Sequence, residues 1–292
     1  MPDRNWLAWS RLRQKRGHFL RDEAHFVGRS SATVKNICEV WRKMGLFGPD
    51  SVPPNHLRPL ITIVQPTIRM KISPATLQFL EDLSNNNDRD WFQANKSRYE
   101  AAQENMKQFL KAVEVALGEK DHLEGATLFR IYRDVRFSKD KLPYKNNFGM
   151  GFTRATKRLR GGYYLHIEPG ASFIGGGFWQ PNPADLKRIR DEFAADEMPI
   201  RQIIADPTFQ QYFGTIQGDT LKTAPRGYDK DSPALDLIRK KSFIVQRNMT
   251  DHAVTSDHFL LDVKLTFEAM RPFFNYLSTV LTTDLNGASL LE

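Results

Sequence analysis

The sequence has a single cysteine, Cys38, in 292 residues. One thiol cannot form an intramolecular disulfide, and it cannot supply the several thiolates of a zinc cluster. A chain of this length can bury about 70–75% of its unfolded surface, so its core does not depend on cross-links. The lack of disulfides is typical of a reducing compartment, and we expect a cytoplasmic protein.

Long apolar runs are also missing. No stretch approaches the roughly 18 consecutive apolar residues of a membrane-spanning helix. The first residues, MPDRNWLAWSRLRQKRG, contain no apolar run of signal-peptide length. The sequence therefore predicts no membrane partner.

Patterns typical of metal and nucleotide sites are absent as well. The seven histidines form no HxH or HExxH spacing. Neither GxxxxGK[ST] nor GxGxxG occurs, which argues against a phosphate-binding loop or a dinucleotide-binding turn. The sequence predicts neither a metal site nor a cofactor.

Positive charge is plentiful, and it is unevenly distributed. The chain is 40% hydrophobic and 26% charged, as in globular proteins, and its net charge is +8. Residues 1–70 hold 12 Lys or Arg and 5 Asp or Glu, whereas the remainder is nearly neutral. Within that remainder, residues 126–160 hold 10 basic and 2 acidic residues. Such a patch attracts phosphates, anionic membranes or acidic proteins, and the sequence alone does not choose among them.

The proline-rich run GPDSVPPNHLRP, residues 48–59, divides the chain into two parts. Residues 1–58 form a basic N-terminal segment in which residues 30–47 have helical spacing. One interpretation is a helix-turn-helix-like reader of DNA; the other is an ordinary amphipathic helix, or an extension before the true start of the domain. We assign residues 71–292 to the second part, a separate domain.

The second part predicts helices on both sides of a cluster of strands. Its capped or amphipathic stretches indicate helices over residues 73–83, 183–196, 198–206, 208–214 and 256–281. Residues 85–117 indicate a turn of asparagines that leads into a long helix. Its alternating stretches indicate strands over residues 126–137, 147–154, 162–169, 171–179 and 241–249, with EPGA as a tight hairpin turn. This order predicts the α+β class, with a mainly antiparallel central sheet and helices before and after it.

Several long stretches of this part carry a resemblance to a known family. They are TLQFLEDLSNNNDRDWFQANKSRYE, FRIYRDVRFSKDKLPYKNNFG, GGYYLHIEPGASFIGGGFW, LKTAPRGYDKDSPALDLIRKKSF and the last helix. Over about residues 71–281 the chain resembles the bacterial and fungal family called domain of unknown function 2461; residues 1–70 fall outside the resemblance. The resemblance implies one α+β domain and brings no established activity.

The stretch RIYRDVRFSKDKLPYK, residues 130–145, concentrates positive charge on a predicted strand. Alternation places Phe129 and Ile131 on a core face, with Arg133 among the apolar residues, and Arg130, Asp134 and Arg136 on a polar face. Guanidinium forks suit carboxylates and phosphates. The predicted ligand-binding residues are Arg130, Tyr132, Arg133, Arg136, Lys139, Lys141 and Lys145. The alternative is a solvated strand face whose charges pair with one another.

Neighbouring strands contribute glycines and acid–base groups. Gly149 and Gly151 share one face of their strand, and residues 175–177 are all glycine. The glycines either leave room above the sheet for a ligand or mark bulges. His166 and Glu168 lie two apart, so they face the same side, together with Tyr164. The catalytic candidates are Asp134, His166 and Glu168, although a strand histidine is more commonly a hydrogen-bonded structural residue.

Three functions follow from these patterns. The first is binding of a phosphorylated or other anionic ligand, with nucleic acid included, in a basic groove on the sheet. The second is an enzyme that acts on a phosphate-bearing or nucleic-acid substrate. The third is a structural or interaction protein with only surface charge, in which every arginine is satisfied by a protein carboxylate.

Overall fold

The computed structural model of the chain describes residues 70–291, except residues 135, 137–140 and 285. The described residues belong to one unit, Ile68–Glu292. The basic N-terminal segment, residues 1–58, lies outside the described residues, and so does the helix predicted over residues 30–47.

In the part of the chain that the structure describes, three helices precede the sheet: α5 (Pro74–Asn85), α6 (Arg89–Ala94) and α7 (Lys96–Gly118). Helix α5 begins as its sequence predicts, because the Ser73 hydroxyl accepts a hydrogen bond from the Ala75 amide and proline occupies the first helical position. The Asp88 carboxylate caps α6 by accepting from the Trp91 amide. The long helix expected over residues 85–117 is divided, since the chain leaves helical geometry at Asn95.

The sheet consists of five strands in sequence order: β1 (Leu123–Leu128), β2 (Phe148–Arg154), β3 (Gly162–Ile167), β4 (Phe173–Phe178) and β5 (Phe243–Asn248). Every neighbouring pair is antiparallel. The predicted hairpin between β3 and β4 is present: the Ala171 amide bonds the Glu168 carbonyl, with Gly170 at φ +70°. Pro169 followed by a positive-φ glycine is the arrangement of a type II turn.

The prediction of a strand over residues 126–137 is wrong in its bounds. Strand β1 begins three residues earlier and ends at Leu128. Beyond it, residues 129–147 form what we call the arm, which is joined by separate bonds from the Arg133 amide to the Pro143 carbonyl and from the Lys145 amide to the Ile131 carbonyl. Pro143 has no N–H to donate, so a regular ladder cannot continue through it.

Six helices follow β4. Four lie between β4 and β5: α8 (Pro183–Ala195), α9 (Met198–Ala205), α10 (Pro207–Tyr212) and α11 (Leu235–Ile238). After β5 come α12 (Asp251–Val254) and α13 (Phe259–Thr282). The α+β class with helices before and after an antiparallel sheet is therefore confirmed. Among the helices of the described residues, none combines the length and the apolar character needed to cross a membrane.

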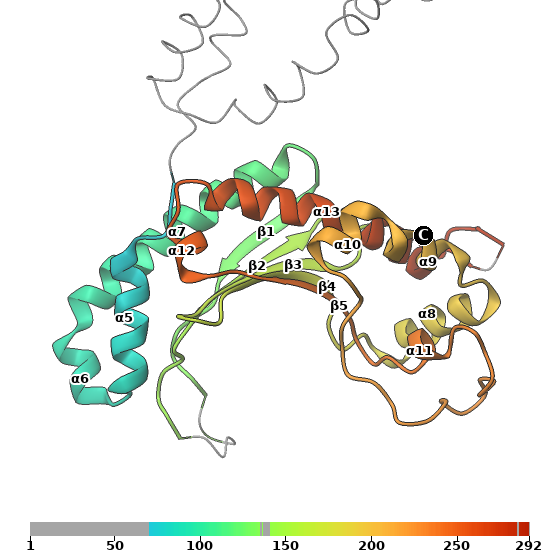
Figure 1. Cartoon of the computed structure of the whole chain (residues 1–292), viewed down its shortest axis with the longest axis horizontal. Helices are drawn as coiled ribbons and strands as arrows, with labels where there is room; N and C mark the ends of the chain where they lie inside the picture. Colours follow the sequence, from blue (N-terminus) through green and yellow to red (C-terminus); the bar gives the residue numbers. More distant parts are fainter. Residues whose placement is uncertain (1–69, 135, 137–140, 285, 292) are drawn as a thin grey trace, which may run out of the picture. The chain divides into compact units, whose positions relative to one another are not determined.

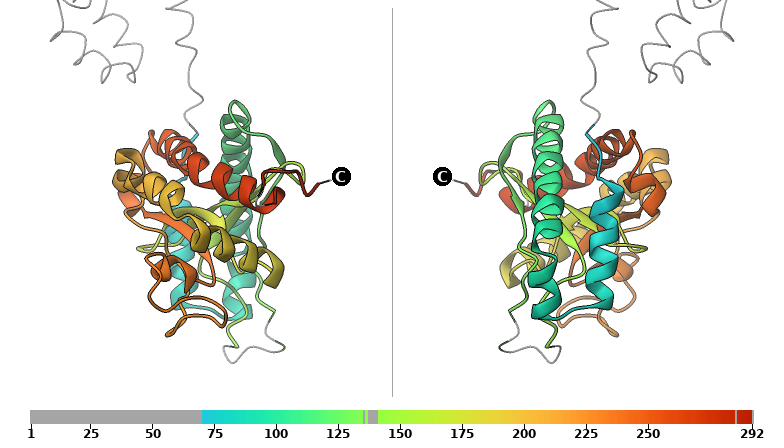
Figure 2. Two further views of the ribbon diagram at one scale, coloured as in Figure 1. Left: turned by 90° about the vertical axis from the view of Figure 1, so that its right-hand side faces the viewer. Right: turned by 90° about the vertical axis from the view of Figure 1, so that its left-hand side faces the viewer.

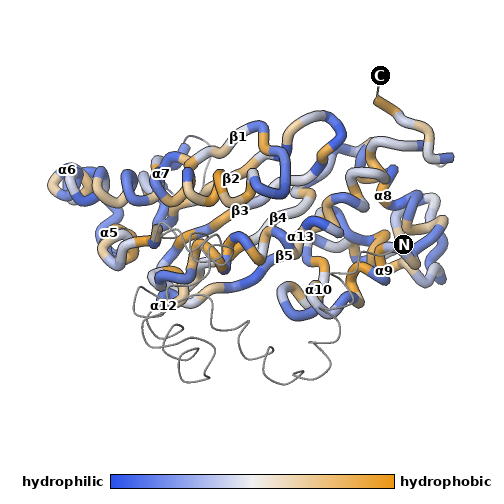
Figure 3. Tube along the Cα trace, turned by 90° about the horizontal axis from the view of Figure 1, so that it is seen from above, coloured by the Kyte–Doolittle hydropathy of each residue, from blue (hydrophilic) through white to orange (hydrophobic). Residues whose placement is uncertain are grey.

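Helices α7 and α13 cover one face of the sheet (Figure 1). Buried side chains of the strands point to this face, among them Met150, Leu165 and Ile174, which are directly opposite one another across β2, β3 and β4. The two helices show mixed hydrophobic and hydrophilic residues along their length in Figure 3, as expected of helices that bury one side. In Figure 2, α5 and α7 run side by side at one end of the domain.

A buried ion pair joins the sheet to these helices. The Arg154 guanidinium of β2 bonds the Asp121 carboxylate (Nε to Oδ2, 2.8 Å), and both side chains are at most 3% exposed. Arg154 also donates to Asn275 of α13, and the Tyr163 hydroxyl of β3 donates to Asp121. Each charged group is thereby bonded within the core, as buried charges require.

Candidate functional site

The second face of the sheet carries the chemically useful side chains. We call it the open face, because among the described helices only α7 and α13 pack broadly on the strands, and both lie on the other side (Figure 1). Strand register aligns two rows of open-face residues. One row is Gly149, His166, Phe173 and Asn248; the other is Gly151, Tyr164, Gly175 and Gln246.

Glycines on the open face are covered by aromatic rings. A Cβ added at Gly149 would lie 2.6 Å from the Tyr164 hydroxyl, and one at Gly151 would lie 3.2 Å from the Phe129 ring. Phe129 is 44% exposed, which corrects its expected place on a core face. The two glycines therefore make room for rings of the protein itself, rather than marking bulges.

Tyr164, His166 and Glu168 form a continuous hydrogen-bonded chain. The Tyr164 hydroxyl lies 3.2 Å from His166 Nδ1, and His166 Nε2 lies 2.8 Å from Glu168 Oε2. The other Glu168 oxygen, Oε1, accepts from the Asn146 amide at 2.6 Å. The His166 ring is stacked on Phe173, with centroids 4.7 Å apart and planes 12° apart. The imidazole is thus held on both nitrogens and on one ring face.

The partners of His166 assign its tautomer. A carboxylate only accepts, so Nε2 carries the proton that is shared with Glu168, and Nδ1 accepts from the Tyr164 hydroxyl. Burial, and then the negative charge of Glu168, raise the pKa of the Tyr164 phenol above its ordinary value. The phenol therefore stays protonated at neutral pH, with a base at its proton.

The arm extends from the edge of the open face. It is fixed to α6 and to the turn before it: Tyr144 stacks on Phe92 at 4.0 Å, and Asn87 bonds both the amide and the carbonyl of Tyr144. Tyr132, opposite Tyr144 in an isolated bridge, also contacts the Phe92 and Tyr99 rings and is 44% exposed. Its ring thus belongs to an aromatic cluster and keeps one side accessible.

Two arginines of the arm, Arg136 and Arg130, act on the carboxylate of Asp134. Arg136 holds Asp134 with two bonds, Nε to Oδ1 at 2.9 Å and Nη2 to Oδ2 at 2.6 Å. These bonds lower the pKa of Asp134, and the charge of Arg130 lowers it further. Asp134 thus has a strong cationic partner and remains ionised, which weakens its case as a general base.

The other predicted ligand-binding residues are spread along the arm. Arg133 and Lys145 are half-buried and Lys141 is exposed, whereas Lys139 lies outside the described residues. Within the described part of the chain, neither the Arg130 nor the Lys145 side chain has a hydrogen bond or an ion pair. In the described residues a carboxylate is bonded to Arg136, and none is bonded to Arg130.

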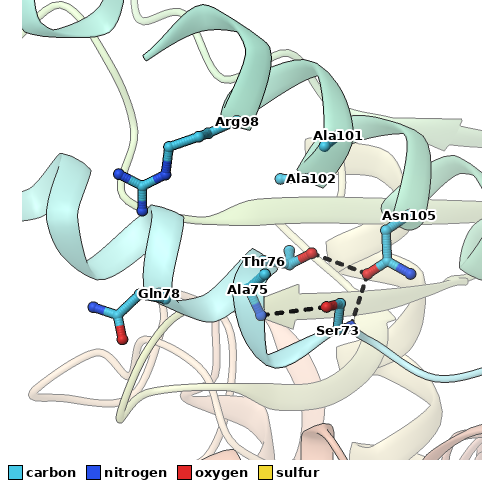
Figure 4. A pocket seen from close by; sticks show the side chains of 8 residues that line it. All are labelled: Ser73, Ala75, Thr76, Gln78, Arg98, Ala101, Ala102 and Asn105. Carbon is cyan, nitrogen blue, oxygen red and sulfur yellow. Dashed lines mark hydrogen bonds between the residues drawn. The ribbon is translucent and has the colours of Figure 1, made fainter.

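Figure 4 shows a separate pocket between α5 and α7. Its polar groups bond one another: the Asn105 side-chain oxygen accepts from the Ser73 amide and the Thr76 hydroxyl. Arg98, also in its lining, is paired with Asp82. This pocket joins two helices and leaves few polar groups for a ligand, so the open face is the better candidate site.

Sequence reasoning missed three members of the site: Phe129, Asn146 and Phe173. Cross-strand register brings Phe173 to His166, and the path of the arm brings Asn146 to Glu168. No local spacing encodes either contact. In the described residues, no group of three or more His, Cys, Asp or Glu side chains is arranged to hold a metal ion.

Comparison with known proteins gives one match. No curated protein and no solved structure matches the chain. Residues 75–276 match the model of a family described as a conserved hypothetical protein, DUF2461. This span includes the sheet, the arm and the candidate site, and it covers more than half of the sequence. The chain therefore belongs to the DUF2461 family, as the resemblance of its sequence predicted.

Proposed function

We propose that the chain binds an anionic ligand at the junction of the arm and the open face. Arg130 and Lys145 are the cations on which the proposal rests. The observation that carries it is that, among the described residues, neither side chain makes a hydrogen bond or an ion pair, although the charge of Arg130 acts on Asp134. Concentrated like charge destabilises a surface unless a counterion is present.

The arm presents these cations in different ways. Asp134 holds and orients the Arg136 guanidinium by a two-bond contact, and the charge of Arg130 acts on the same carboxylate. Lys145 follows the aromatic anchor Tyr144, so the backbone that carries it is fixed to α6. An anion with two or three oxygens, such as a phosphate or carboxylate group, fits this set of donors.

Arginine substitutions test the proposal. Phosphate should raise the melting temperature of the full chain, compared with chloride at equal ionic strength, because binding to the folded state stabilises it. Arg130→Ala should weaken phosphate binding by about one order of magnitude, since it removes a charge-assisted contact. Without phosphate, the melting temperature of the variant should match that of the wild type, because Arg130 is exposed.

Arg158→Ala is the matched control. Arg158 is also an exposed arginine, but it lies in the loop after β2, whereas the arm precedes β2. It should leave the phosphate effect unchanged. If phosphate stabilises wild type, Arg130→Ala and Arg158→Ala equally, the effect is general to the protein's charge and the arm is not an anion site.

A further inference from the structure

The chain of Tyr164, His166 and Glu168 has the order of a proton relay. A phenol donates to an imidazole nitrogen, and the second nitrogen of that ring donates to a carboxylate. The carboxylate is itself oriented by Asn146. A base whose far nitrogen is held by a carboxylate can accept a proton and have the resulting positive charge stabilised.

A structural histidine explains these contacts less completely. Hydrogen bonding alone would satisfy His166 at both nitrogens, but it does not account for a phenol that is only partly buried at the outer end of the chain of hydrogen bonds. Two glycines opposite and beside Tyr164 keep the space at the phenol ring free of side chains from β2. Phe129 and Phe173 lie 6.2 and 5.8 Å from the Tyr164 ring, as apolar walls on its two sides.

We propose that Tyr164 is a catalytic residue that removes a proton from a hydroxyl group of a bound anion, with His166 and Glu168 as its positioning residues. The Tyr164 oxygen takes the proton of the substrate hydroxyl while its own proton moves to His166 Nδ1. The imidazolium that forms is paired with the Glu168 carboxylate. The negative charge of the substrate alkoxide is balanced by the positive charge of the imidazolium, so the net charge of the complex is unchanged, and the reverse transfers restore the resting state.

The substrate class follows from the surroundings. The inference rests on the proposed function for its anionic group, which the arm cations hold. The walls next to Tyr164 are aromatic, so the part of the substrate that lies on the open face is planar or apolar. An aromatic or unsaturated carboxylate or phosphate that carries a hydroxyl group meets both conditions.

A reactive probe tests the relay without knowledge of the natural substrate. An aryl sulfonyl fluoride reacts with an activated tyrosine: the phenol oxygen bonds sulfur, the S–F bond breaks, fluoride leaves, and the phenol proton goes to His166. We would treat the full chain with the anionic para-(fluorosulfonyl)benzoate and with its neutral methyl ester. Mass spectrometry then gives the labelling rate of each tyrosine.

Tyr164 should react roughly tenfold faster than Tyr132 with either reagent, because only Tyr164 has an imidazole base at its hydroxyl. Tyr132 is a suitable internal control, since its side chain is 44% exposed. His166→Phe keeps a ring to stack on Phe173 and should bring the Tyr164 rate down to that of Tyr132. Glu168→Gln is a smaller change and should give a Tyr164 labelling rate between those of the wild type and His166→Phe. If His166→Phe does not fold, the Glu168→Gln rate alone tests the relay.

The two reagents separate this inference from the proposed function. Arg130→Ala should abolish the preference of Tyr164 for the anionic reagent and leave the reaction with the neutral ester unchanged. Equal reactivity of both reagents, with rapid His166-dependent labelling, overturns anion binding by the arm and retains the relay. Labelling of Tyr164 no faster than that of Tyr132, or unaffected by substitution of His166 and Glu168, overturns the relay.

Discussion

Arg154 places a full positive charge inside the domain, where it bonds the equally buried carboxylate of Asp121 and neutral acceptors. Arg154→Met keeps the apolar stem and removes the charge, which leaves the buried Asp121 carboxyl without its main partner. Loss of one member of a buried pair costs about 3–5 kcal/mol of unfolding free energy. Denaturant unfolding of the variant measures this loss.

Arg158→Met makes the same substitution at an exposed site four residues further along the chain. It should change the unfolding free energy by less than about 0.5 kcal/mol, as is usual for surface substitutions. A similar loss in both variants would mean that the side-chain stem, rather than the buried charge, accounts for the effect.

Tyr163 should make the folded domain less stable at alkaline pH. Burial, and then its hydrogen bond to Asp121, raise the pKa of the Tyr163 phenol far above its ordinary value. In the unfolded chain this phenol ionises near pH 10, whereas in the folded chain it remains protonated there. The unfolded state therefore binds fewer protons above this pH, and the free energy of unfolding falls as pH rises.

Urea unfolding between about pH 8 and 11 tests whether the free energy of unfolding falls as pH rises, and whether Tyr163 causes the fall. The wild-type unfolding free energy should decline above pH 10, and Tyr163→Phe should show a shallower decline from a lower starting value. Some decline should persist, because burial also raises the pKa of Tyr228, to about 12. An equal slope in both proteins would assign the alkaline sensitivity to other groups.

At the scale of elements, the arm depends on contacts with the helices before the sheet. Asn87→Ala removes both hydrogen bonds to the backbone of Tyr144 and leaves its stacking on Phe92 in place. We expect the Tyr144 amide to exchange with solvent at least about tenfold faster, since each lost bond is worth roughly 1 kcal/mol. Hydrogen exchange followed by peptide mass spectrometry measures this.

The adjacent Asn86→Ala serves as the control. The Asn86 side chain bonds only the Asp82 carbonyl at the end of its own helix. Its loss should increase exchange near the end of α5 and leave the arm unchanged. If both variants expose the arm equally, the turn between α5 and α6 acts as a unit and Asn87 has no special part in it.

Element types were largely predictable from the sequence, and element ends were less so. Periodicity located α8, α9, α10 and α13, whereas the short helices α11 and α12 were not predicted. The glycine and alternating stretches located β2 to β4. Strand β1 was misplaced because its own residues, LEGATL, alternate weakly, whereas the following arm alternates strongly without forming a ladder. Pro143 interrupts that ladder from the partner side, ten residues beyond Arg133, to which its carbonyl is bonded.

The contacts of the candidate site were likewise only partly predictable from the sequence. Spacing of two along a strand sufficed to place Tyr164, His166 and Glu168 together, and the same spacing placed Asp134 beside Arg136. The contacts of His166 with Phe173 and of Glu168 with Asn146 depend on register and on the path of the arm. These are tertiary properties, so a single sequence does not specify them.

On the scale of the whole molecule, the hydrophobic core of the unit Ile68–Glu292 is internally complete. Its buried side chains run from Ile72 to Leu281 and form one cluster that includes residues of every strand except β1, which packs beside it. A fragment of residues 68–292 should therefore fold alone. We expect cooperative thermal unfolding within a few degrees of the full chain, as measured by circular dichroism.

Phosphate stabilisation of this fragment adds a useful comparison. The fragment lacks most of the excess positive charge, which resides in residues 1–70. If the arm binds anions, the fragment should retain the response to phosphate and its loss in Arg130→Ala. A fragment without a cooperative transition would show that the first residues contribute to the folded state.

The order of strands in the sheet also bears on how the chain reaches its native state. Strands β1 to β4 pair with neighbours that are close in sequence, but β5 reaches β4 only after residues 179–242 have been spanned. Closing a loop of that length adds little to the equilibrium cost, since each doubling costs about 0.6 kcal/mol, yet contacts between distant residues form slowly. Amides of β5 should gain protection after those of β3 in pulse-labelled hydrogen exchange during refolding. Until then the outer edge of β4 is an unpaired template, and association of partly folded chains should start there.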